Sequence, residues 1–527
     1  MKKMKQFLIL FLLSATSHTF ATNYFVKPSG SNSNDGLTPA TAFETLQFAA
    51  DQTNPGDTVF AMAGTYTNLV RATNVLSIYH SGTSDNYIVY KNFPGETPII
   101  KLYDQWCGIA VQGSDYIVID GFKVVGNNDS ITLTYAQSQQ DSLNNPTTSC
   151  NGIGIGSQYS NPANKPHHVI VRNCNVSKCG GGGIFAYPGD YITIENNIVS
   201  ECAWYSPYGN SAITLFQLYN SDTTDAIKNF IIGNICYRNE EYIPVHYSGA
   251  ISDGNAISID DSRNTQNGSV MGAYVGKTYI ANNLVFDNGG RGIHCYSSDN
   301  VIVVNNTSYK NCQSPTVHDG ELTAYSADSI WFINNIAWPD SGVAPIFKSN
   351  STTAAISVEN NLWATNSGLA NPFGANTILG NPDFVLHSIN PVFADFHLQN
   401  SSIAINTGSH LFAPTIDKDG VIRLISDSVD IGCYEYFNAT GVRIEPDPNL
   451  LSIFPNPASN IITLSIDDKN NTDYIIEIYN VIGTLVKTKT LKQNQRQINI
   501  EDLINGVYLV TIKTKDLTTN QRLIIQR

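Results

Sequence analysis

Short runs in which apolar and polar residues alternate make up most of the chain, and Asn, Gly, Ser and Asp separate them. Six of these runs align without gaps: ITIENNIVSEC, FIIGNICYRN, YIANNLVFDN, VIVVNNTSYKN, WFINNIAWPD and ISVENNLWATN. Each one predicts a short strand, a corner that contains asparagine, and a second short strand.

The aligned asparagines recur at spacings of 37, 49, 23, 29 and 26 residues, and they are Asn197, Asn234, Asn283, Asn306, Asn335 and Asn361. A basic coil of 23–29 residues repeated this often indicates a solenoid. Strands of four or five residues leave no room for crossover helices, so the sequence predicts an all-β, right-handed parallel β-helix. At each corner an asparagine amide can bond its own backbone and the asparagine of the next coil, and we expect such a ladder. Cys174 takes this position one coil earlier.

The two ends of the chain differ from the repeat. Residues 1–21 have a secretory signal pattern, with Lys2, Lys3 and Lys5 before a short apolar run and Ala21 at the cleavage site. Residues 22–437 hold the repeat, and Phe43 to Asp51 has helical spacing suited to capping its open end. Residues 438–450 read as a linker, and residues 451–527 as a small β-sandwich. No segment is long and apolar enough to span a membrane, so we expect an exported protein. We also expect it to act as a monomer.

Charge and cysteine content narrow the class of protein. The formal net charge is −14, which argues against nucleic acid as a partner because phosphate binding needs a basic surface. Nine cysteines are an odd number, so at least one has no partner within the chain. Cys179 and Cys202 lie 23 residues apart at equivalent repeat positions, where either a disulfide or stacked thiols can form.

Two stretches resemble known families. The segment FPNPASN and the later strand GVYLV closely resemble the type A sorting domain of the type IX secretion system of Bacteroidetes, over residues 451–527. That resemblance implies passage through the secretion machinery, then removal of the domain with release or surface attachment. The beginning and end of residues 22–437, such as YFVKPSGSNSNDGLTPATAFETL and DGVIRLISDSVDIGCYEY, look like the ends of secreted β-helix proteins of the pectate-lyase-like group. This second resemblance is specific for the fold and says little about activity, since the scaffold supports lyases, hydrolases and non-enzymes alike.

The long spacings point to a working face, because insertions in a solenoid map to loops on one side. The inserted text is aromatic and polar, and it suggests Trp204, Tyr208 and Tyr247 as side chains that stack on sugar rings. For any one of them, packing of a loop over the wall is the simpler explanation.

The strands after the corners align as GIFAY, AITLF, AISID, GIHCY and ELTAY. Alternation predicts that these strands turn Asp260, His294, Tyr296 and Glu321 outward, with Asp253 and Arg291 just before them. We therefore expect Tyr296 and Glu321 to contact substrate. Arg291 and Glu321 can also form an ion pair.

The leading interpretation is a polysaccharide lyase that acts on a uronate-containing glycan. β-Elimination needs a cation on the uronate carboxylate and a base near the α-carbon. Asp253, Asp260 and Asp261 are candidate Ca²⁺ ligands, although Asp261 can equally cap a turn. Arg291 or His294 is the candidate base. The chain has neither the lysine base nor the clustered DDGxD calcium motif of other lyases on this scaffold.

Two alternatives remain open. A glycoside hydrolase would use Asp253 with Asp260 or Asp261 as acid and base, and a neutral glycan suits the negative net charge better than a polyuronate. A non-catalytic solenoid would bind carbohydrate on the same face without cleaving it.

Overall fold

The computed structural model describes residues 21–349, 355–364, 374–423 and 428–436, together with residues 451–525 apart from short gaps at 457, 467–473, 481–483, 493–495, 505 and 514–517. The predicted signal peptide up to residue 20 and the predicted linker lie outside the described residues. Those two boundaries stay predictions.

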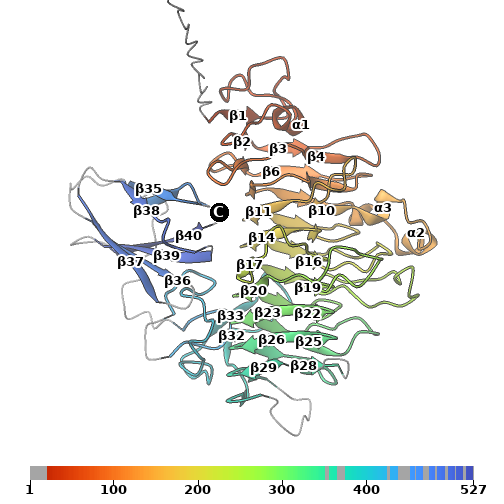
Figure 1. The fold of residues 1–527 in the computed structure, drawn as a ribbon. Helices are drawn as coiled ribbons and strands as arrows, with labels where there is room; N and C mark the ends of the chain where they lie inside the picture. The colour runs from red at the N-terminus through yellow and green to blue at the C-terminus, as the bar shows by residue number, and fades with distance from the viewer. Residues whose placement is uncertain are drawn as a thin grey trace, which may run out of the picture.

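In the part of the chain that the structure describes, three long parallel sheets stack coil upon coil along one axis (Figure 1). Most coils contribute one strand to each sheet. Sheet A consists of β1 (Asn23–Val26), β2 (Thr58–Ala61), β5 (Ile88–Asn92), β8 (Ile117–Asp120), β11 (His167–Arg172), β14 (Asp190–Glu195), β17 (Ile227–Ile232), β20 (Lys277–Ala281), β23 (Asp299–Val304), β26 (Asp328–Ile333) and β29 (Ile356–Glu359). Sheet B consists of β3 (Gly64–Tyr66), β6 (Pro98–Lys101), β9 (Lys123–Val125), β12 (Asn175–Ser177), β15 (Ile198–Ser200), β18 (Ile235–Tyr237), β21 (Leu284–Phe286), β24 (Thr307–Tyr309), β27 (Ile336–Trp338), β30 (Leu362–Trp363) and β31 (Ile378–Leu379).

Sheet C completes each coil and bears the predicted working face. It consists of β4 (Asn74–Ile78), β7 (Cys107–Gln112), β10 (Asn151–Gly156), β13 (Ile184–Tyr187), β16 (Ile213–Phe216), β19 (Ile257–Asp260), β22 (Ile293–Tyr296), β25 (Gly320–Tyr325) and β28 (Ala344–Lys348). The predicted right-handed parallel β-helix is confirmed by this strand order, with one hydrophobic core enclosed between the sheets.

Short helices lie at one end and on one side of the solenoid. The predicted cap is α1 (Leu46–Ala50), which begins at Thr45 as its N-cap and buries Leu46 and Ala49 against the first coils. An insertion between β9 and β10 contains η1 (Asn128–Ser130), α2 (Leu133–Ser138) and α3 (Pro146–Ser149). None of the described helices is long and apolar enough to cross a membrane.

The predicted asparagine ladder is present at the corner between sheets A and B. Each ladder amide donates through Nδ2 to Oδ1 of the asparagine in the next coil, from Asn197 through Asn361, at 3.0 to 3.1 Å except for 2.9 Å between Asn283 and Asn306. The same Oδ1 also accepts the backbone N–H of the preceding ladder residue, as Asn306 does from Asn283 at 3.0 Å. Cys174 joins the ladder as expected, because its backbone N–H donates to Asn197 Oδ1 at 2.9 Å.

A second asparagine precedes many ladder positions, and it has a separate role. Asn282, Asn305, Asn334 and Asn360 all have positive φ, a left-handed conformation that asparagine tolerates better than most residues. Their side chains point outward and donate to carbonyls of the closing segment, residues 374–436, for example Asn305 Nδ2 to Asp430 O at 2.8 Å. This segment includes β32 (Phe384–Leu386) and β33 (Asp395–Leu398) and covers the apolar outer face of sheet B.

A second ladder, which the sequence did not predict, stacks one corner further along each coil. Cys202 N–H donates to Asn239 Oδ1, and Asn239, Asn288 and Asn311 then bond in series through their amides at 2.8 and 2.7 Å. All nine cysteines are free and buried, so Cys179 and Cys202 are stacked thiols rather than a disulfide.

The sorting region forms two antiparallel sheets with their own core. One sheet contains β34 (Leu451–Phe454), β35 (Ile461–Ile466) and β38 (Gln497–Asn499), and the other contains β37 (Leu485–Leu491), β36 (Tyr474–Asn480), β39 (Gly506–Lys513) and β40 (Thr518–Ile525). Ile524 packs against apolar residues on the outer face of sheet A. Figure 1 shows these sheets beside sheet A and away from sheet C.

Replacing Asn283 by leucine is expected to destabilise the β-helix. Asn283 is fully buried, and the change removes its bonds to Ile231 O and to two neighbouring ladder residues. Each buried group left without a partner costs roughly 1–3 kcal/mol, so the melting temperature should fall by several degrees. The matched control is Asn400→Leu, at an exposed asparagine outside both ladders. An unchanged melting temperature for Asn283→Leu would show that the ladder is dispensable.

Residues 22–437 alone are expected to fold and to keep the activity of the whole chain. The sorting region has its own hydrophobic core and contacts sheet A rather than the working face. Circular dichroism of the shortened chain should retain its β signal, with a slightly lower melting temperature because the contact of Ile524 is lost. Loss of that signal would contradict the predicted boundary.

Candidate functional site

The predicted working face is the outer side of sheet C, where the register aligns side chains of successive coils. Asp260 lies opposite Phe216 in the coil before it and Tyr296 in the coil after it, and Tyr296 lies opposite Tyr325. Two residues further back along each strand, Ser258, His294 and Thr323 are aligned in the same way. The structure thus brings the predicted Asp260, His294 and Tyr296 together on adjacent coils.

Asp253 and Glu241 form a coupled pair of carboxyl groups beside Asp260. Glu241 is buried, and its Oε2 accepts the backbone N–H groups of Ser252 at 2.8 Å and Asp253 at 3.1 Å. Asp253 accepts from Ser252 Oγ at 2.8 Å and Asn255 Nδ2 at 3.1 Å. Burial raises the pKa of both carboxyl groups, and the charge of Asp253 raises that of Glu241 further. The pair therefore retains a proton more readily than two exposed carboxylates would.

A glycine makes room for this pair. Gly209 has a φ of +65°, and a Cβ at this position would lie 2.9 Å from Asp253 Oδ2. A side chain here would be strained and would also press on the carboxylate.

Asp260 is the carboxyl group best suited to donate a proton. Its Oδ1 accepts one hydrogen bond, from Gln266 Nε2 at 3.0 Å. Burial, followed by the negative charge of Asp253, raises the pKa of Asp260 to about 8. Near neutral pH this carboxyl group is therefore mostly protonated while it faces outward from sheet C.

Arg291 is an anchored cation. Its Nη1 donates to Ser252 O at 2.6 Å, its Nη2 pairs with Asp319, and its guanidinium lies 5.5 Å from the ring centre of Tyr325. Although burial opposes the charge, Asp319 and Asp253 outweigh it and raise the pKa of Arg291. A general base must give up its proton at the working pH, and a raised pKa opposes that role.

His294 faces away from the core, as predicted, but it is only 6% exposed because the rings of Tyr296 and Tyr325 lie against it. Alternation placed His294 on the outer side but did not show that neighbouring rings cover it. Its Nδ1 is 2.6 Å from Thr323 Oγ1, and no hydrogen bond among the described residues involves Nε2. Burial and then the charge of Arg291 lower its pKa well below the usual value, so the imidazole is neutral.

Glu321 is not on the surface, which corrects the prediction that it contacts substrate. Its side chain is fully buried and ends the second ladder, accepting from Asn311 Nδ2 and Ser308 Oγ at 2.6 Å and from Asn311 N at 2.8 Å. The rule of alternation fails here because Glu321 lies where the chain turns from sheet B into sheet C. The ion partner of Arg291 is Asp319, not Glu321.

Asp261 caps a turn. Its two oxygens accept from Thr265 N and Oγ1, Gln266 N and Gln217 Nε2, at 2.8 to 2.9 Å. Among the described residues, no group of three or more His, Cys, Asp or Glu side chains is arranged to hold a metal ion. The calcium site at Asp253, Asp260 and Asp261 therefore stays a prediction.

The predicted aromatic contacts divide into two kinds. Trp204 packs against Tyr205 and Tyr242 and donates from Nε1 to Arg238 O at 3.1 Å, so it fixes a loop. Tyr208 is part-exposed, and its hydroxyl donates to Leu143 O in the insertion before β10.

Three of the predicted aromatic side chains are exposed enough to contact a ligand, namely Tyr247 at 80%, Tyr208 at 45% and Tyr296 at 40%. The pKa of Tyr247 is raised to about 12 by burial of its hydroxyl and then by the charges of Asp253 and Asp260, which places that hydroxyl near both carboxyl groups.

Sequence reasoning missed part of this site. Glu241 and the pairing of Asp319 come from inserted loops without periodicity, so no pattern marked them. Tyr187 and Phe216 end strands that the alignment had already matched with the strand of Asp260, and that shared position was the available signal. Several buried polar atoms around the site have no partner among the described residues, namely Ser206 Oγ, Asn210 Oδ1, Glu241 Oε1 and Arg291 Nε.

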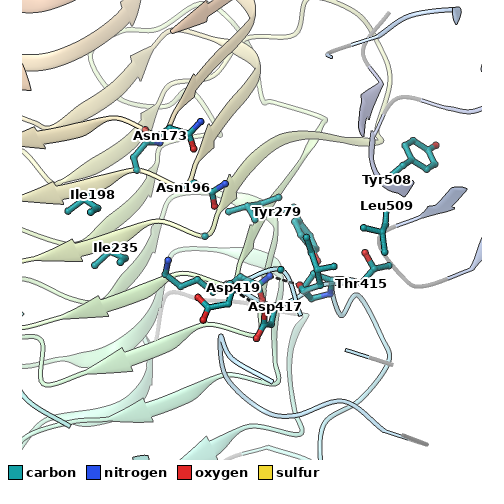
Figure 2. A pocket seen from close by; sticks show the side chains of 18 residues that line it. Asn173, Asn196, Ile198, Ile235, Tyr279, Thr415, Asp417, Asp419, Tyr508 and Leu509 are labelled. Atoms are coloured by element: carbon teal, nitrogen blue, oxygen red, sulfur yellow. Dashed lines mark hydrogen bonds between the residues drawn. The ribbon is translucent and has the colours of Figure 1, made fainter. Parts of the chain in front are cut away.

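A pocket elsewhere on the molecule does not coincide with this site. It lies between the outer corner of sheets A and B, residues 414–420 and the sorting region, and Asn196, Tyr279 and Leu509 are among its lining residues (Figure 2). Its carboxylates are engaged in structure, since Asp417 accepts backbone N–H groups and Asp419 pairs with His397. We therefore place the candidate chemistry on sheet C.

Two family models match parts of the chain. Residues 452–526 match the secretion system C-terminal sorting domain, which confirms the resemblance of the C-terminal region and indicates a secreted or surface location. Residues 50–220 match the family described as periplasmic copper-binding protein (NosD). A search of curated proteins finds no significant match.

Solved structures similar to this one include a pectate lyase, Pel9A, at 17% identity and a TM-score of 0.48, covering 80% of this chain and 97% of that one. A family 28 exopolygalacturonase of Yersinia enterocolitica has 12% identity and a TM-score of 0.43, covering 69% and 72%. A rhamnogalacturonan lyase has 15% identity and a TM-score of 0.38, covering 70% and 91%. Identities this low say nothing of the reaction.

The raised pKa of Asp260 predicts a pH-dependent loss of stability. Because folding raises this pKa from 3.8 to about 8, the folded state favours the protonated form, and the advantage is lost as pH rises from about 4 through 8. Thermal melts of wild type and Asp260→Asn across this range should show the wild type losing stability relative to the variant.

The matched control is Asp225→Asn, at an exposed carboxylate. It should track the wild type at every pH. A constant difference between wild type and Asp260→Asn would mean that Asp260 is ionised throughout.

Proposed function

We propose that this exported protein cleaves a polysaccharide on the outer face of sheet C, with Asp260 as the proton donor. The supporting observation is one outward carboxyl group, Asp260, that keeps its proton near neutral pH because it is buried and lies near the negative charge of Asp253. Cleavage of a glycosidic bond by hydrolysis needs such a division between an acid and a partner carboxylate.

In this proposal Asp260 protonates the leaving oxygen of the glycosidic bond. Asp253 hydrogen bonds with Ser252 and Asn255 and lies near the cation of Arg291. Once ionised, Asp253 either attacks the anomeric carbon of the sugar or removes a proton from the attacking water. The positive charge of Arg291, which Asp319 holds in an ion pair, favours the charged form of Asp253. Glu241 stays protonated, because it and the neighbouring Asp253 do not both ionise readily.

β-Elimination on a uronate-containing glycan is the second candidate. It is favoured by His294, a neutral imidazole whose Nε2 has no hydrogen bond among the described residues. It requires Arg291 to exchange its ion partner Asp319 for a uronate carboxylate. His294 would remove the α-proton, Arg291 would bind the carboxylate, and Asp260 would protonate the leaving oxygen. A non-catalytic carbohydrate-binding protein would use the same face without these proton transfers.

The test incubates the mature protein with a panel of neutral and uronate-containing polysaccharides, and records reducing ends together with ultraviolet absorbance of unsaturated products. Hydrolysis gives reducing ends alone, and elimination gives both signals. Asp260→Asn should lower the rate at least about 100-fold, since a positioned acid contributes that much, while the melting temperature at pH 5 stays near that of the wild type.

The control Asp225→Asn should keep the wild-type rate. Full activity of Asp260→Asn, or no cleavage of any glycan by the wild type, would contradict the proposal. Unsaturated products from the wild type, together with loss of activity in His294→Gln, would establish elimination. Because His294 is buried, this variant must also be checked for folding.

A further inference from the structure

The outer face of sheet C bears a row of aromatic side chains with Asp260 in its middle. Tyr187, Phe216, Asp260, Tyr296 and Tyr325 end β13, β16, β19, β22 and β25, which are neighbours in the sheet. Opposed positions pair Phe216 with Asp260, Asp260 with Tyr296, and Tyr296 with Tyr325. We call these five residues the aromatic row.

The rings of the row follow one another closely on both sides of the carboxyl group. Ring centres are 4.8 Å apart for Tyr187 and Phe216 and 6.5 Å apart for Tyr296 and Tyr325. The ring of Phe347, which lies opposite Thr323 on the next strand, is 5.2 Å from the ring of Tyr325. Tyr187 is 44% exposed, and Phe216 and Tyr325 are partly exposed. Large aromatic residues normally bury their area, so a row of at least partly exposed rings on both sides of one carboxyl group indicates a binding surface.

We infer that the aromatic row binds one extended, neutral glycan chain parallel to the axis of the β-helix, with at least two sugar units on each side of Asp260. This inference rests on the proposed function for the position of the scissile bond. Neighbouring strands in a sheet lie about 4.8 Å apart, so the rings recur on a scale comparable to the repeat of sugar rings in an extended chain. The apolar C–H face of a pyranose packs on an aromatic ring, while tyrosine hydroxyls remain free to hydrogen bond its edge.

The charges around the row favour a neutral chain. The only ionisable carboxyl group within the row is Asp260, which holds its proton, and the nearby cation Arg291 is already paired with Asp319. The protein as a whole has a formal charge of −14, which disfavours a polyanion. A polyuronate would find no free cation among the described residues of the row.

The experiment measures binding of the full chain to soluble neutral polysaccharides (β-glucan, xylan, mannan and galactan) and to polygalacturonate, by affinity gel electrophoresis and calorimetry. Variants are Tyr187→Ala and Tyr325→Ala, each two coils from Asp260. Tyr187→Leu and Tyr325→Leu keep apolar volume without the ring, in case an alanine variant fails to fold. Phe393→Ala is the control, at an exposed ring in the closing segment.

At least one neutral polysaccharide is expected to bind, and each tyrosine variant should weaken that binding roughly 3- to 10-fold. Phe393→Ala should have no effect. Affinity for a disaccharide should not depend on Tyr187 or Tyr325, whereas affinity for a hexasaccharide should depend on both. Tighter binding of polygalacturonate than of every neutral glycan, or unchanged affinity in both tyrosine variants, would overturn the inference.

The same data separate this inference from the proposed function. If binding depends on both tyrosines but no glycan is cleaved, binding by the aromatic row stands and the proposed enzymatic function is rejected. If both tyrosine variants cleave the glycan at the wild-type rate and bind it with wild-type affinity, the proposed function stands and binding by the aromatic row is rejected.

Discussion

The bond between stacked asparagine amides is the interaction on which the rest of this structure depends. At each corner from Asn197 to Asn361 the amide satisfies buried backbone groups and bonds the next coil, so the coils keep a common register. That register aligns the strand ends of sheet C. Asp260, Tyr296 and Tyr325 are neighbours because their coils are held level, although they are far apart in sequence.

The same constraint explains where the chemistry can lie. At the corners of the solenoid the asparagines of the two ladders have structural partners, and the carboxyl group of Glu321 ends the second ladder. On the outer side, long insertions before and after β19 bury Glu241 almost fully and Asp260 in part. No positively charged side chain among the described residues pairs with either carboxyl group. Burial without a nearby positive charge raises the pKa of a carboxyl group, and this is why Asp260 on sheet C is suited to donate a proton.

The fold was predictable because a repeat states the same physical requirement many times. The asparagine spacing predicted the coils, and helical spacing near Leu46 predicted the cap. The second ladder was harder to find, because Cys179, Cys202 and Glu321 replace asparagine at some of its levels. Alternation correctly turned Asp260 and Tyr296 outward, but it could not show that rings cover His294 or that Glu321 turns inward at a corner. Contacts made by loops, such as those of Glu241 and Asp319, have no period from which to predict them.

The central claim is that Asp260 holds a proton near neutral pH on the face that binds the glycan. Infrared difference spectra of wild type minus Asp260→Asn, recorded as a function of pH, isolate the carboxyl stretch of this one residue. The account predicts a protonated carboxyl band that persists at pH 7 and disappears around pH 8. A spectrum that shows only the ionised carboxylate from pH 5 upward would contradict it.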